Sequence, residues 1–470
     1  MSKFTIANLK KTIHYLKRNG LRDTYLAALE RLGQKEDDAY AYEPPSEERL
    51  AEQRVWSRTH KAVKFSILVP AYRTPVAYLE ALLDSVVAQT YPNWELILAE
   101  AGTDMTAPGG ESPISAAAQA VGDSRIRYVA LGRNGGIAEN TNAALKEATG
   151  DYIGLLDHDD LLTPDALFEM AAEIERAREQ GIVPGFLYSD EDKCEESGTA
   201  FYDLHRKCDF NLDLLLSNNY ICHFTVMEAG LMRRLGFRQA YDGAQDHDLV
   251  LRAAGELLLG EQGRLQTEGE SRIRHIAKVL YHWRCHKNST AENPESKQYA
   301  YEAGCRAVTD FFVLHHVPCR VEPAANLGFF KVIYMPDAMA ARADVGIVGG
   351  KLLDGKRRVT GALYTLDGTA DYKGLPAGFG GRMHRASLQQ DMDTVDIRLM
   401  RIRPELLPLL AEVLSGQEEW ADHVREEQGR LRAEGLSEEA CERLSRELCH
   451  KVRAAGYRIL WQPEWREKVK

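Results

Sequence analysis

Long apolar runs are missing from this sequence of 470 residues, and so are clustered cysteines. No stretch reaches the roughly 18 apolar residues that a membrane-spanning helix needs, and the opening residues, MSKFTIANLKK, hold no apolar signal-peptide core. The eight cysteines include no C-x-x-C pair and are too few for a disulfide-stapled secreted scaffold. We therefore expect a cytoplasmic protein that does not span a membrane and keeps its thiols reduced.

An excess of positive charge is also missing, because the formal net charge is −11 and the isoelectric point is near 5.8. A protein that coats nucleic acid needs a strong positive field, so we expect no nucleic-acid partner. Basic residues do gather at the N-terminus, where no acid occurs before Asp23 and the basic side chains are Lys3, Lys10, Lys11, Lys17, Arg18 and Arg22.

The same N-terminal segment has apolar residues at helical spacing from Phe4 to Leu32, interrupted at Asn19-Gly20, which predicts a helical hairpin. Two interpretations stay open. The hairpin is either a packing element on a neighbouring domain or a basic amphipathic surface in peripheral contact with the inner face of an anionic membrane. The polar stretch from Gly33 to about Gln53 is expected to be a linker.

The length of the chain exceeds one ordinary hydrophobic core, so we expect more than one domain. From Phe65 onward, short apolar runs alternate with helical segments. The expected strands are 65–69, 94–98, 126–131 and 152–156, and the expected helices between them include 76–89 and 136–148. This alternation predicts an α/β fold in which a mainly parallel, Rossmann-like sheet is covered by helices on both faces.

A smaller α/β module is expected after residue 322. Its expected strands are 345–352, 358–366, 397–402 and 458–461, and its expected helix is 437–454, ending before Gly456. The predicted domains are a hairpin and linker at 1–62, an α/β domain at 63–322 and the smaller module at 323–470.

The strongest chemical signal is the acidic segment Asp157-His158-Asp159-Asp160, which directly follows a buried run. Residues i and i+2 of an extended segment project to the same side, so Asp157 and Asp159 can converge beyond the end of the strand. Clustered carboxylates repel each other unless a cation or a proton intervenes, and oxygen ligands suit magnesium or manganese. The alternative is an acidic turn leading into a helix that opens at Thr163-Pro164.

A second acidic segment surrounds Asp246. The apolar residues 249–251 and 253 predict a helix that begins near Gln245, with Asp246 in its first turn. The positive end of a helix keeps a carboxylate ionised, as a general base requires. The alternative is an ordinary acidic first turn.

A third segment, Tyr281 to His286, alternates aromatic with basic residues. Extended backbone would place His282, Arg284 and His286 on one face. Imidazole can bind a divalent metal, and a guanidinium can neutralise a diphosphate. The alternative is a surface strand whose Tyr281 and Trp283 face the core.

The order of the motifs is more informative than any one of them. The segments, in order, are 69–72 (VPAY), 95–100 (ELILAE), 134–142 (NGGIAENTN), 150–152 (GDY), 157–160 (DHDD), 245–248 (QDHD) and 281–286 (YHWRCH). This arrangement resembles the family-two inverting glycosyltransferases of the GT-A fold, of the type that builds bacterial surface polysaccharides. The resemblance covers roughly Phe65 to Thr290.

The resemblance implies a role for each matching residue. The catalytic base would be Asp246. A divalent manganese or magnesium ion would be bound by Asp157, Asp159 and His286, with His282 as a further candidate. The nucleotide sugar would be bound by Pro70, Ala71, Tyr72, Arg73, Glu100, Asn134, Gly136, Asn142, Asp157, His158 and Arg284. The sugar or acceptor would lie near Asn219, His223, Gln245 and Trp283.

The sequence departs from the family pattern in two places. The usual pair of acids after the second strand appears as Glu100-Ala101, which affects the nucleotide contact. The segments 345–355 and 452–463 resemble the later half of a second GT-A domain whose nucleotide-binding half is absent, and Glu447 is its only acid in register with a base. We therefore predict a degenerate, noncatalytic module for acceptor binding, domain packing or self-association into a homo-oligomer.

The expected reaction moves a hexosyl or deoxyhexosyl group from a nucleotide-diphosphate sugar to the hydroxyl of a saccharide or lipid-linked acceptor, in cell-surface polysaccharide or glycolipid assembly. One alternative is a noncatalytic nucleotide-sugar-binding or scaffolding protein. Another is a nucleotidyltransferase, although such enzymes usually carry a glycine-rich loop after the first strand and residues 71–75 contain no glycine.

Overall fold

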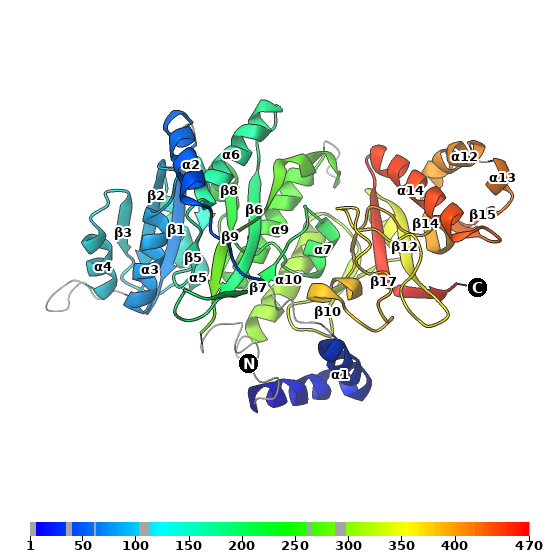
Figure 1. Cartoon of the computed structure of the whole chain (residues 1–470), viewed down its shortest axis with the longest axis horizontal. Coiled ribbons are helices and arrows are strands. Elements are labelled where there is room, and N and C mark those ends of the chain that lie inside the picture. Colours follow the sequence, from blue (N-terminus) through cyan, green and yellow to red (C-terminus); the bar gives the residue numbers. More distant parts are fainter. Residues whose placement is uncertain are drawn as a thin grey trace.

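The structure is a computed structural model that describes residues 6–33, 40–60, 63–102, 112–260, 265–286, 298–416 and 418–469. Figure 1 shows an elongated molecule, in which a large unit (residues 63–314) and a small unit (residues 338–469) lie beside each other along the long axis. Lys3, Phe4 and Thr290, which were named from the sequence, lie outside the described residues.

The large unit is built on a nine-stranded sheet in the order β3-β2-β1-β4-β8-β6-β9-β5, with β7 paired to β6. Its strands are β1 (Phe65–Ala71), β2 (Trp94–Glu100), β3 (Ile126–Ala130), β4 (Tyr152–Leu155), β5 (Leu161–Leu162), β6 (Phe186–Cys194), β7 (Phe201–His205), β8 (Thr225–Glu228) and β9 (Ile273–Arg284). The first four strands pair in parallel, and β6 pairs in parallel with β9. The predicted α/β fold is confirmed, and it is the fold class that the resemblance implied.

The parallel register decides where the functional residues lie. Ala71 at the end of β1 pairs with Glu100 at the end of β2, and Leu68 of β1 pairs with Leu155 of β4. The carboxyl ends of these strands therefore meet at one edge of the sheet, which is where ligands bind in such sheets.

Helices cover both faces of this sheet, as predicted. One face carries α3 (Val76–Val87), α4 (Pro113–Val121) and α6 (Ala166–Glu179). The other face carries α5 (Ile137–Glu147), α7 (Leu212–Ser217), α8 (Ala229–Leu235), α9 (Gln245–Leu258) and α10 (Gln298–Leu314). The helices expected at 76–89, at 136–148 and from Gln245 are confirmed, with slightly shorter bounds for the first two.

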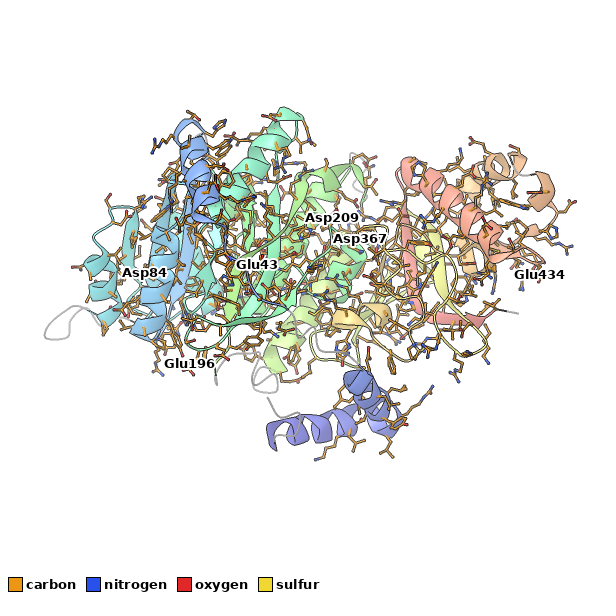
Figure 2. All side chains as sticks on the ribbon, in the orientation of Figure 1. Glu43, Asp84, Glu196, Asp209, Asp367 and Glu434 are labelled. Atoms are coloured by element: carbon orange, nitrogen blue, oxygen red, sulfur yellow. The ribbon has the colours of Figure 1, made fainter. Side chains whose placement is uncertain are left out.

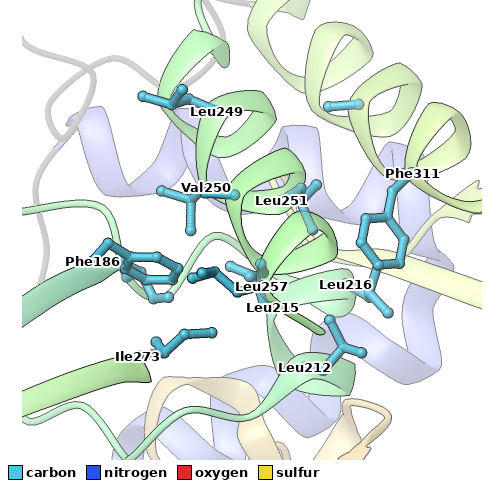
Figure 3. Close-up of a cluster of buried hydrophobic side chains, with 14 of the residues drawn as sticks. Phe186, Leu212, Leu215, Leu216, Leu249, Val250, Leu251, Leu257, Ile273 and Phe311 are labelled. Atoms are coloured by element: carbon cyan, nitrogen blue, oxygen red, sulfur yellow. The ribbon is translucent and has the colours of Figure 1, made fainter. Parts of the chain in front are cut away.

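The core between α7, α9 and the sheet holds the catalytic candidates in place. Figure 3 shows leucines of α7 and α9 around Phe186 of β6 and Ile273 of β9. Burying a leucine side chain contributes about 1.5–3 kcal/mol. Several such side chains on each short helix therefore fix the position of Asp246 at the start of α9.

The small unit has its own sheet of six strands, in the order β13-β17-β12-β14-β16-β15. The strands are β12 (Val345–Leu353), β13 (Gln390–Asp391), β14 (Met400–Ile402), β15 (Val424–Glu427), β16 (Arg430–Ala433) and β17 (Arg458–Lys468). The helices are α11 (Ala338–Ala341), α12 (Leu407–Ser415), α13 (Glu418–Ala421) and α14 (Glu438–Ala454). An antiparallel hairpin of β10 (Cys319–Pro323) and β11 (Phe330–Tyr334) precedes this unit.

The expected strand at 345–352 and helix at 437–454 are confirmed, and the strand expected at 458–461 extends to Lys468. The strand expected at 358–366 is wrong. Gly361 has a φ of 87° and the next amide donates to the Asp396 carboxylate, so the chain turns there and forms only isolated bridges. The first half of the strand expected at 397–402 is a 3-10 turn, and only Met400–Ile402 is extended.

The N-terminal helix α1 (Ile6–Gly33) is broken at Gly20, where φ is 79°, as the predicted hairpin requires. It lies beside the small unit (Figure 1), and the Glu30 carboxylate accepts hydrogen bonds from the amides of Gly380 and Gly381. The linker expected up to Gln53 is wrong in its second half, where Ser46 caps helix α2 (Glu47–Thr59). No helix among the described residues combines the length and the apolar character needed to cross a membrane.

Candidate active site

The acidic segment after β4 is anchored to β9 by its last residue. Asp160 is buried, and its carboxylate accepts hydrogen bonds from the Tyr281 hydroxyl at 2.5 Å and the Arg284 amide at 2.7 Å. Burial, with the nearby charges of Asp159 and Asp157, raises the pKa of Asp160 well above its usual value. The side chain of Asp157 is 53% exposed and that of Asp159 is 20% exposed. Asp160 therefore anchors the loop to β9, and Asp157 and Asp159 are the more exposed carboxylates of the loop.

Three groups at this loop fit a divalent cation. Asp157, Asp160 and His223 offer ligand atoms that all lie within 4.8 Å of one another. Oxygen ligands with one imidazole suit magnesium or manganese. The pKa of Asp157 is raised, chiefly because the surrounding protein displaces water and further because Asp159 lies nearby. A bound cation would offset the repulsion between the Asp157 and Asp159 carboxylates.

The orientation of His223 is fixed by Glu191 and Tyr281. Its Nδ1 lies 3.1 Å from the Glu191 carboxylate, its ring stacks on Tyr281 at 4.6 Å, and its Nε2 lies 3.9 Å from Asp157. A carboxylate behind a ligand imidazole is the usual way to fix the ring and its tautomer. The other nitrogen, Nε2, is the one that faces the acidic loop.

Glu191 is the centre of a buried charge cluster that the sequence analysis missed. Its carboxylate contacts His205, Lys207 and His223, each at 3.1 Å. Burial acts to raise the pKa of Glu191, but Lys207 and the two histidines lower it well below its usual value. Lys207 also donates to the carbonyls of Ile221 and His223, so it clamps the segment that carries His223.

Asp246 lies in the first turn of α9, as predicted. Its Oδ2 accepts a hydrogen bond from Asn219 Nδ2 at 2.8 Å, and the Cys222 thiol lies 3.7 Å from the same oxygen. Cys222 in turn lies 3.4 Å from His223 Nε2. This chain of contacts places Asp246 close to the acidic loop. Among the described residues no hydrogen bond reaches Oδ1 of Asp246, so that oxygen can accept a proton.

Two predicted metal ligands take other partners. Asp159 and His286 are bonded to each other, at 2.9 Å, and are not part of the group around Asp157. His282 is 4% exposed, and its Nδ1 lies 2.5 Å from Asp192. Tyr281 and Trp283 face His223, so His282 points to the opposite side of the strand. The predicted ligands Asp157, Asp159 and His286 stay a prediction.

Arg284 also differs from its predicted place. It is 1% exposed, and its guanidinium donates to the main-chain carbonyls of Asp159 at 2.5 Å and Glu196 at 2.7 Å. Arg284 therefore supports the acidic loop, while its Nη2 is buried without a hydrogen-bond partner among the described residues. Its contact with phosphate stays a prediction.

The predicted nucleotide contacts at β1 and β2 do come together. Pro70 and Ala71 end β1, and Tyr72 and Arg73 follow as exposed residues. Arg73 lies over the Tyr72 ring at 5.1 Å. Glu100 ends β2, where its carboxylate accepts hydrogen bonds from Tyr128 at 2.7 Å and from Ser112.

The predicted contacts at α5 split into two groups. Asn134 Oδ1 accepts from the Gly136 amide at 3.0 Å, and a Cβ at Gly136, where φ is 92°, would lie 2.3 Å from Asp242. These two residues form the tight entry to the helix. Both ends of the Asn142 amide bond the backbone of Phe237, so this side chain holds α5 against the segment after α8, and its donor contact stays a prediction.

The remaining predicted residues have separate surroundings. Buried Nδ1 of His158 has no hydrogen-bond partner among the described residues. Gln245 accepts from the amide of Gly243 at 2.8 Å and so helps to start α9. The centroid of the Trp283 ring lies 5.8 Å from that of the His223 ring.

One sequence signal could have identified Glu191. The apolar residues 186–188, followed by Asp190-Glu191-Asp192, repeat the pattern of a buried run that ends in acids, which had singled out Asp157. Lys207 carries no such signal, because only the folded chain brings it beside β6.

Comparison with known proteins identifies relatives for this part of the chain. Residues 66–236 match the family described as Glycosyl transferase family 2. The chain is 42% identical over 247 residues to the uncharacterized protein y4gI of Sinorhizobium fredii, covering 52% of this chain and 25% of that protein. It is 32% identical over 261 residues to the O-antigen biosynthesis protein RfbC of Myxococcus xanthus, covering 55% of this chain and 19% of that protein.

A third relative is of more similar length. The uncharacterized glycosyltransferase YwdF of Bacillus subtilis is 30% identical over 200 residues, covering 41% of this chain and 68% of that protein. By contrast, the chain spans only about a quarter of y4gI and about a fifth of RfbC.

Proposed function

Because this chain belongs to glycosyltransferase family 2, we propose that it transfers a sugar from a nucleotide-diphosphate sugar to an acceptor hydroxyl, with inversion at the anomeric carbon. The observation that carries the proposal is the chain of contacts that joins Asp157, His223 and Asp246 through Cys222, at the carboxyl edge of the parallel strands. A carboxylate loop for the donor thus faces a carboxylate base for the acceptor.

Asp246 is the proposed base. Asn219 holds Oδ2 of its carboxylate at 2.8 Å, which leaves Oδ1 to take the proton of the attacking hydroxyl. The N-terminus of α9 favours the ionised carboxylate before transfer. A positioned base of this kind contributes about 10²–10⁴-fold to a rate.

The donor would lie along the edge formed by β1, β2 and β4. Tyr72 and Arg73 are exposed beside Glu100 and support a site for the base and ribose. Asp157, with Asp160 and His223, would hold a manganese or magnesium ion, whose charge stabilises the diphosphate leaving group when it is bound. Asp159 and His286 would act together as a pair at the rim of the loop.

The acceptor and the wider setting are also proposals. We propose a saccharide or lipid-linked saccharide acceptor in surface polysaccharide or glycolipid assembly. Lys17, Leu21, Arg22 and Tyr25 are exposed on α1, and these residues support a peripheral contact with the inner face of a membrane. The division into 1–62, 63–322 and 323–470, and a noncatalytic, self-associating role for the last part, stay predictions.

The two alternatives, a noncatalytic binding or scaffolding protein and a nucleotidyltransferase, are less well supported. Family membership favours sugar transfer over nucleotidyl transfer.

The test is thermal stabilisation by a panel of UDP, GDP and dTDP sugars, each with and without manganese. One donor class should stabilise the protein in a manganese-dependent manner, by about 2.7 kcal/mol at a hundredfold excess over Kd. Asp157→Asn should lose the manganese dependence, whereas Glu434→Gln, at an exposed site on the small unit (Figure 2), should not. Stabilisation by no nucleotide sugar would overturn the proposal.

A further inference from the structure

One segment of the large unit, residues 204–220, is fastened to the small unit along its length. Within it, α7 lies at the junction of the two units (Figure 1). The side chain of Asn211 bonds the backbone N–H and C=O of Asp391, both at 2.9 Å. The Ser217 hydroxyl donates to the carbonyl of Gln389 at 2.8 Å. Asn211 and Ser217 are buried, and breaking a buried hydrogen bond leaves a polar group without a partner, so these contacts hold α7 firmly.

The beginning of the same segment is held by two arginines from one turn of the small unit. Arg382 donates to the Leu204 carbonyl at 3.0 Å. Arg385 donates to the Arg206 carbonyl at 3.2 Å. The next residue in the chain is Lys207. The small unit therefore fixes the backbone that carries the Lys207 side chain.

Lys207 reaches from this segment to the backbone beside the proposed metal site. Its side chain is 0% exposed. The three N–H groups of its ammonium have three acceptors, which are the Glu191 carboxylate at 3.1 Å, the Ile221 carbonyl at 2.5 Å and the His223 carbonyl. A buried charge is stable only when it is paired and hydrogen-bonded, so these contacts are strongly favoured. They hold the backbone of His223 where its ring lies between Glu191 and Asp157.

The far end of the segment leads to Asn219, which contacts the proposed base. Helix α7 ends two residues earlier, and Asn219 Nδ2 donates to the Asp246 carboxylate at 2.8 Å. Asn219 Oδ1 accepts from the Cys222 amide at 3.4 Å. The two ends of the segment therefore hold one short stretch, residues 219–223, which contacts both Asp246 and Asp157.

We propose that the small unit is a positioning module for the transfer reaction, because it fastens segment 204–220 at both ends. Lys207 at one end holds the stretch that carries the proposed metal ligand His223. Asn219 at the other end holds the proposed base Asp246. The inference rests on the proposed function and gives the small unit a part in it. A displacement of about 1 Å between reacting groups can cost about 10²-fold in rate, so the fastening should be visible in kcat.

The first test removes the two arginine contacts in the full chain. Arg382→Ala/Arg385→Ala should speed hydrogen exchange of the backbone amides of 219–223, measured by mass spectrometry without any ligand. The control is Arg401→Ala/Arg425→Ala, which removes two exposed arginines of the same unit. Neither control arginine donates a hydrogen bond to the fastened segment in the part of the chain that the structure describes. Exchange in the control should match the wild type.

The kinetic test uses the donor chosen from the thermal panel and nitrophenyl glycosides as acceptors. In Arg382→Ala/Arg385→Ala, kcat should fall by about tenfold. The donor KM at saturating manganese should not change, because the exposed residues beside Glu100 are untouched. The manganese concentration needed for half-maximal rate should rise, because His223 is less firmly held. The control should keep all three values.

The second test removes the lysine itself. Lys207→Met leaves the Glu191 carboxylate without its ammonium partner and risks unfolding, so the variant to use is Glu191→Gln/Lys207→Met, which removes both charges together. This variant should fold, as measured by its thermal midpoint. It should show the same faster exchange of 219–223 and a fall in kcat of about 10–10²-fold.

Each contrary outcome has a defined meaning. Exchange of 219–223 in Arg382→Ala/Arg385→Ala that equals the control would overturn the fastening. Faster exchange with an unchanged kcat, or a fall in kcat no larger than the loss of folded protein, would overturn the positioning role. A wild type that transfers from no nucleotide sugar, with the exchange results as expected, would refute the proposed transfer and not the fastening.

Discussion

The buried ion pair between Arg342 and Asp213 joins the two units, and its removal should be strongly destabilising. One guanidinium nitrogen, Nη1, lies 2.7 Å from both Asp213 oxygens, and Nη2 lies 2.5 Å from Asp344. The side chains of Arg342 and Asp213 are 0% and 1% exposed. Burial acts to lower the pKa of Arg342, but Asp213 and Asp344 raise it well above its usual value, so the guanidinium stays charged at neutral pH.

The size of the effect follows from what each variant leaves behind. Arg342→Met leaves Asp213 with the Tyr334 hydroxyl at 3.1 Å as its remaining side-chain partner. An uncompensated buried charge costs about 3–5 kcal/mol of unfolding free energy. Asp344 retains Arg458 at 2.9 Å, so the cost should come mainly from Asp213. The double variant Arg342→Met/Asp213→Leu removes both charges and should cost much less than the two single variants added together.

The assay is urea unfolding followed by tryptophan fluorescence, with the midpoint and slope compared across the double-mutant cycle. Arg320→Met serves as the control, because Arg320 pairs with Glu322 on the surface, where the side chains are 66% and 42% exposed. That pair should contribute less than about 1 kcal/mol. Additive costs in the double variant, or a cost for Arg342→Met as small as that of the control, would refute the reasoning.

Three further results are expected. Burial acts to raise the pKa of Glu95, but hydrogen bonds from Ser66 and Thr149 lower it from 4.5 to about 2. The ionised carboxylate should therefore stabilise the folded protein by about 3 kcal/mol. This contribution should be complete above pH 4.5 and lost as the pH falls toward 2. Glu95→Gln should flatten that part of the stability profile measured by thermal unfolding. Chelation with EDTA should abolish donor stabilisation, and manganese or magnesium should restore it in the wild type but not in Asp157→Asn. Co-sedimentation with anionic vesicles should fall when Leu21 and Tyr25 are changed to Ser, whereas neutral vesicles should bind neither form; equal binding would exclude the membrane contact.

The alternating pattern of the large unit could be predicted because each part of it is local. The runs at 65–69 and 94–98 are apolar enough to be buried strands, and Glu100 after the second marks the carboxyl edge. Asp246 could be placed at a helix start because residues 249–251 have helical periodicity. Local pattern and motif order together are sufficient to predict the fold of the large unit.

The partners of those carboxylates could not be predicted, because they depend on pairing between distant strands. The sequence predicts the alternation of side chains along β9, but it does not say which face of the strand lies toward Asp157. In the structure His282 contacts Asp192, and His223 is the histidine beside Asp157. The contacts of Arg284 could not be predicted for the same reason, because its guanidinium donates to the carbonyls of Asp159 and Glu196, which are distant in the sequence.

The strands of the small unit are harder to predict from the sequence. The strand at 345–353 is continuously buried and apolar, so its pattern predicts it. The segment 358–366 has a similar composition but contains Gly361 in a left-handed conformation, and the side chain that stabilises this turn, Asp396, is 35 residues further along the chain.

The central claim is that Asp246 removes the proton from the acceptor hydroxyl, and Asp246→Asn tests it most directly. The rate of nucleoside diphosphate release should be measured with the donor chosen from the thermal panel and a set of nitrophenyl glycosides as acceptors. The exposed residue Asp84 of helix α3 (Figure 2) supplies the control Asp84→Asn. We expect transfer to fall by about 10²–10⁴-fold in Asp246→Asn, with donor stabilisation unchanged and the control fully active. A variant that keeps transfer within about tenfold of the wild type would contradict it.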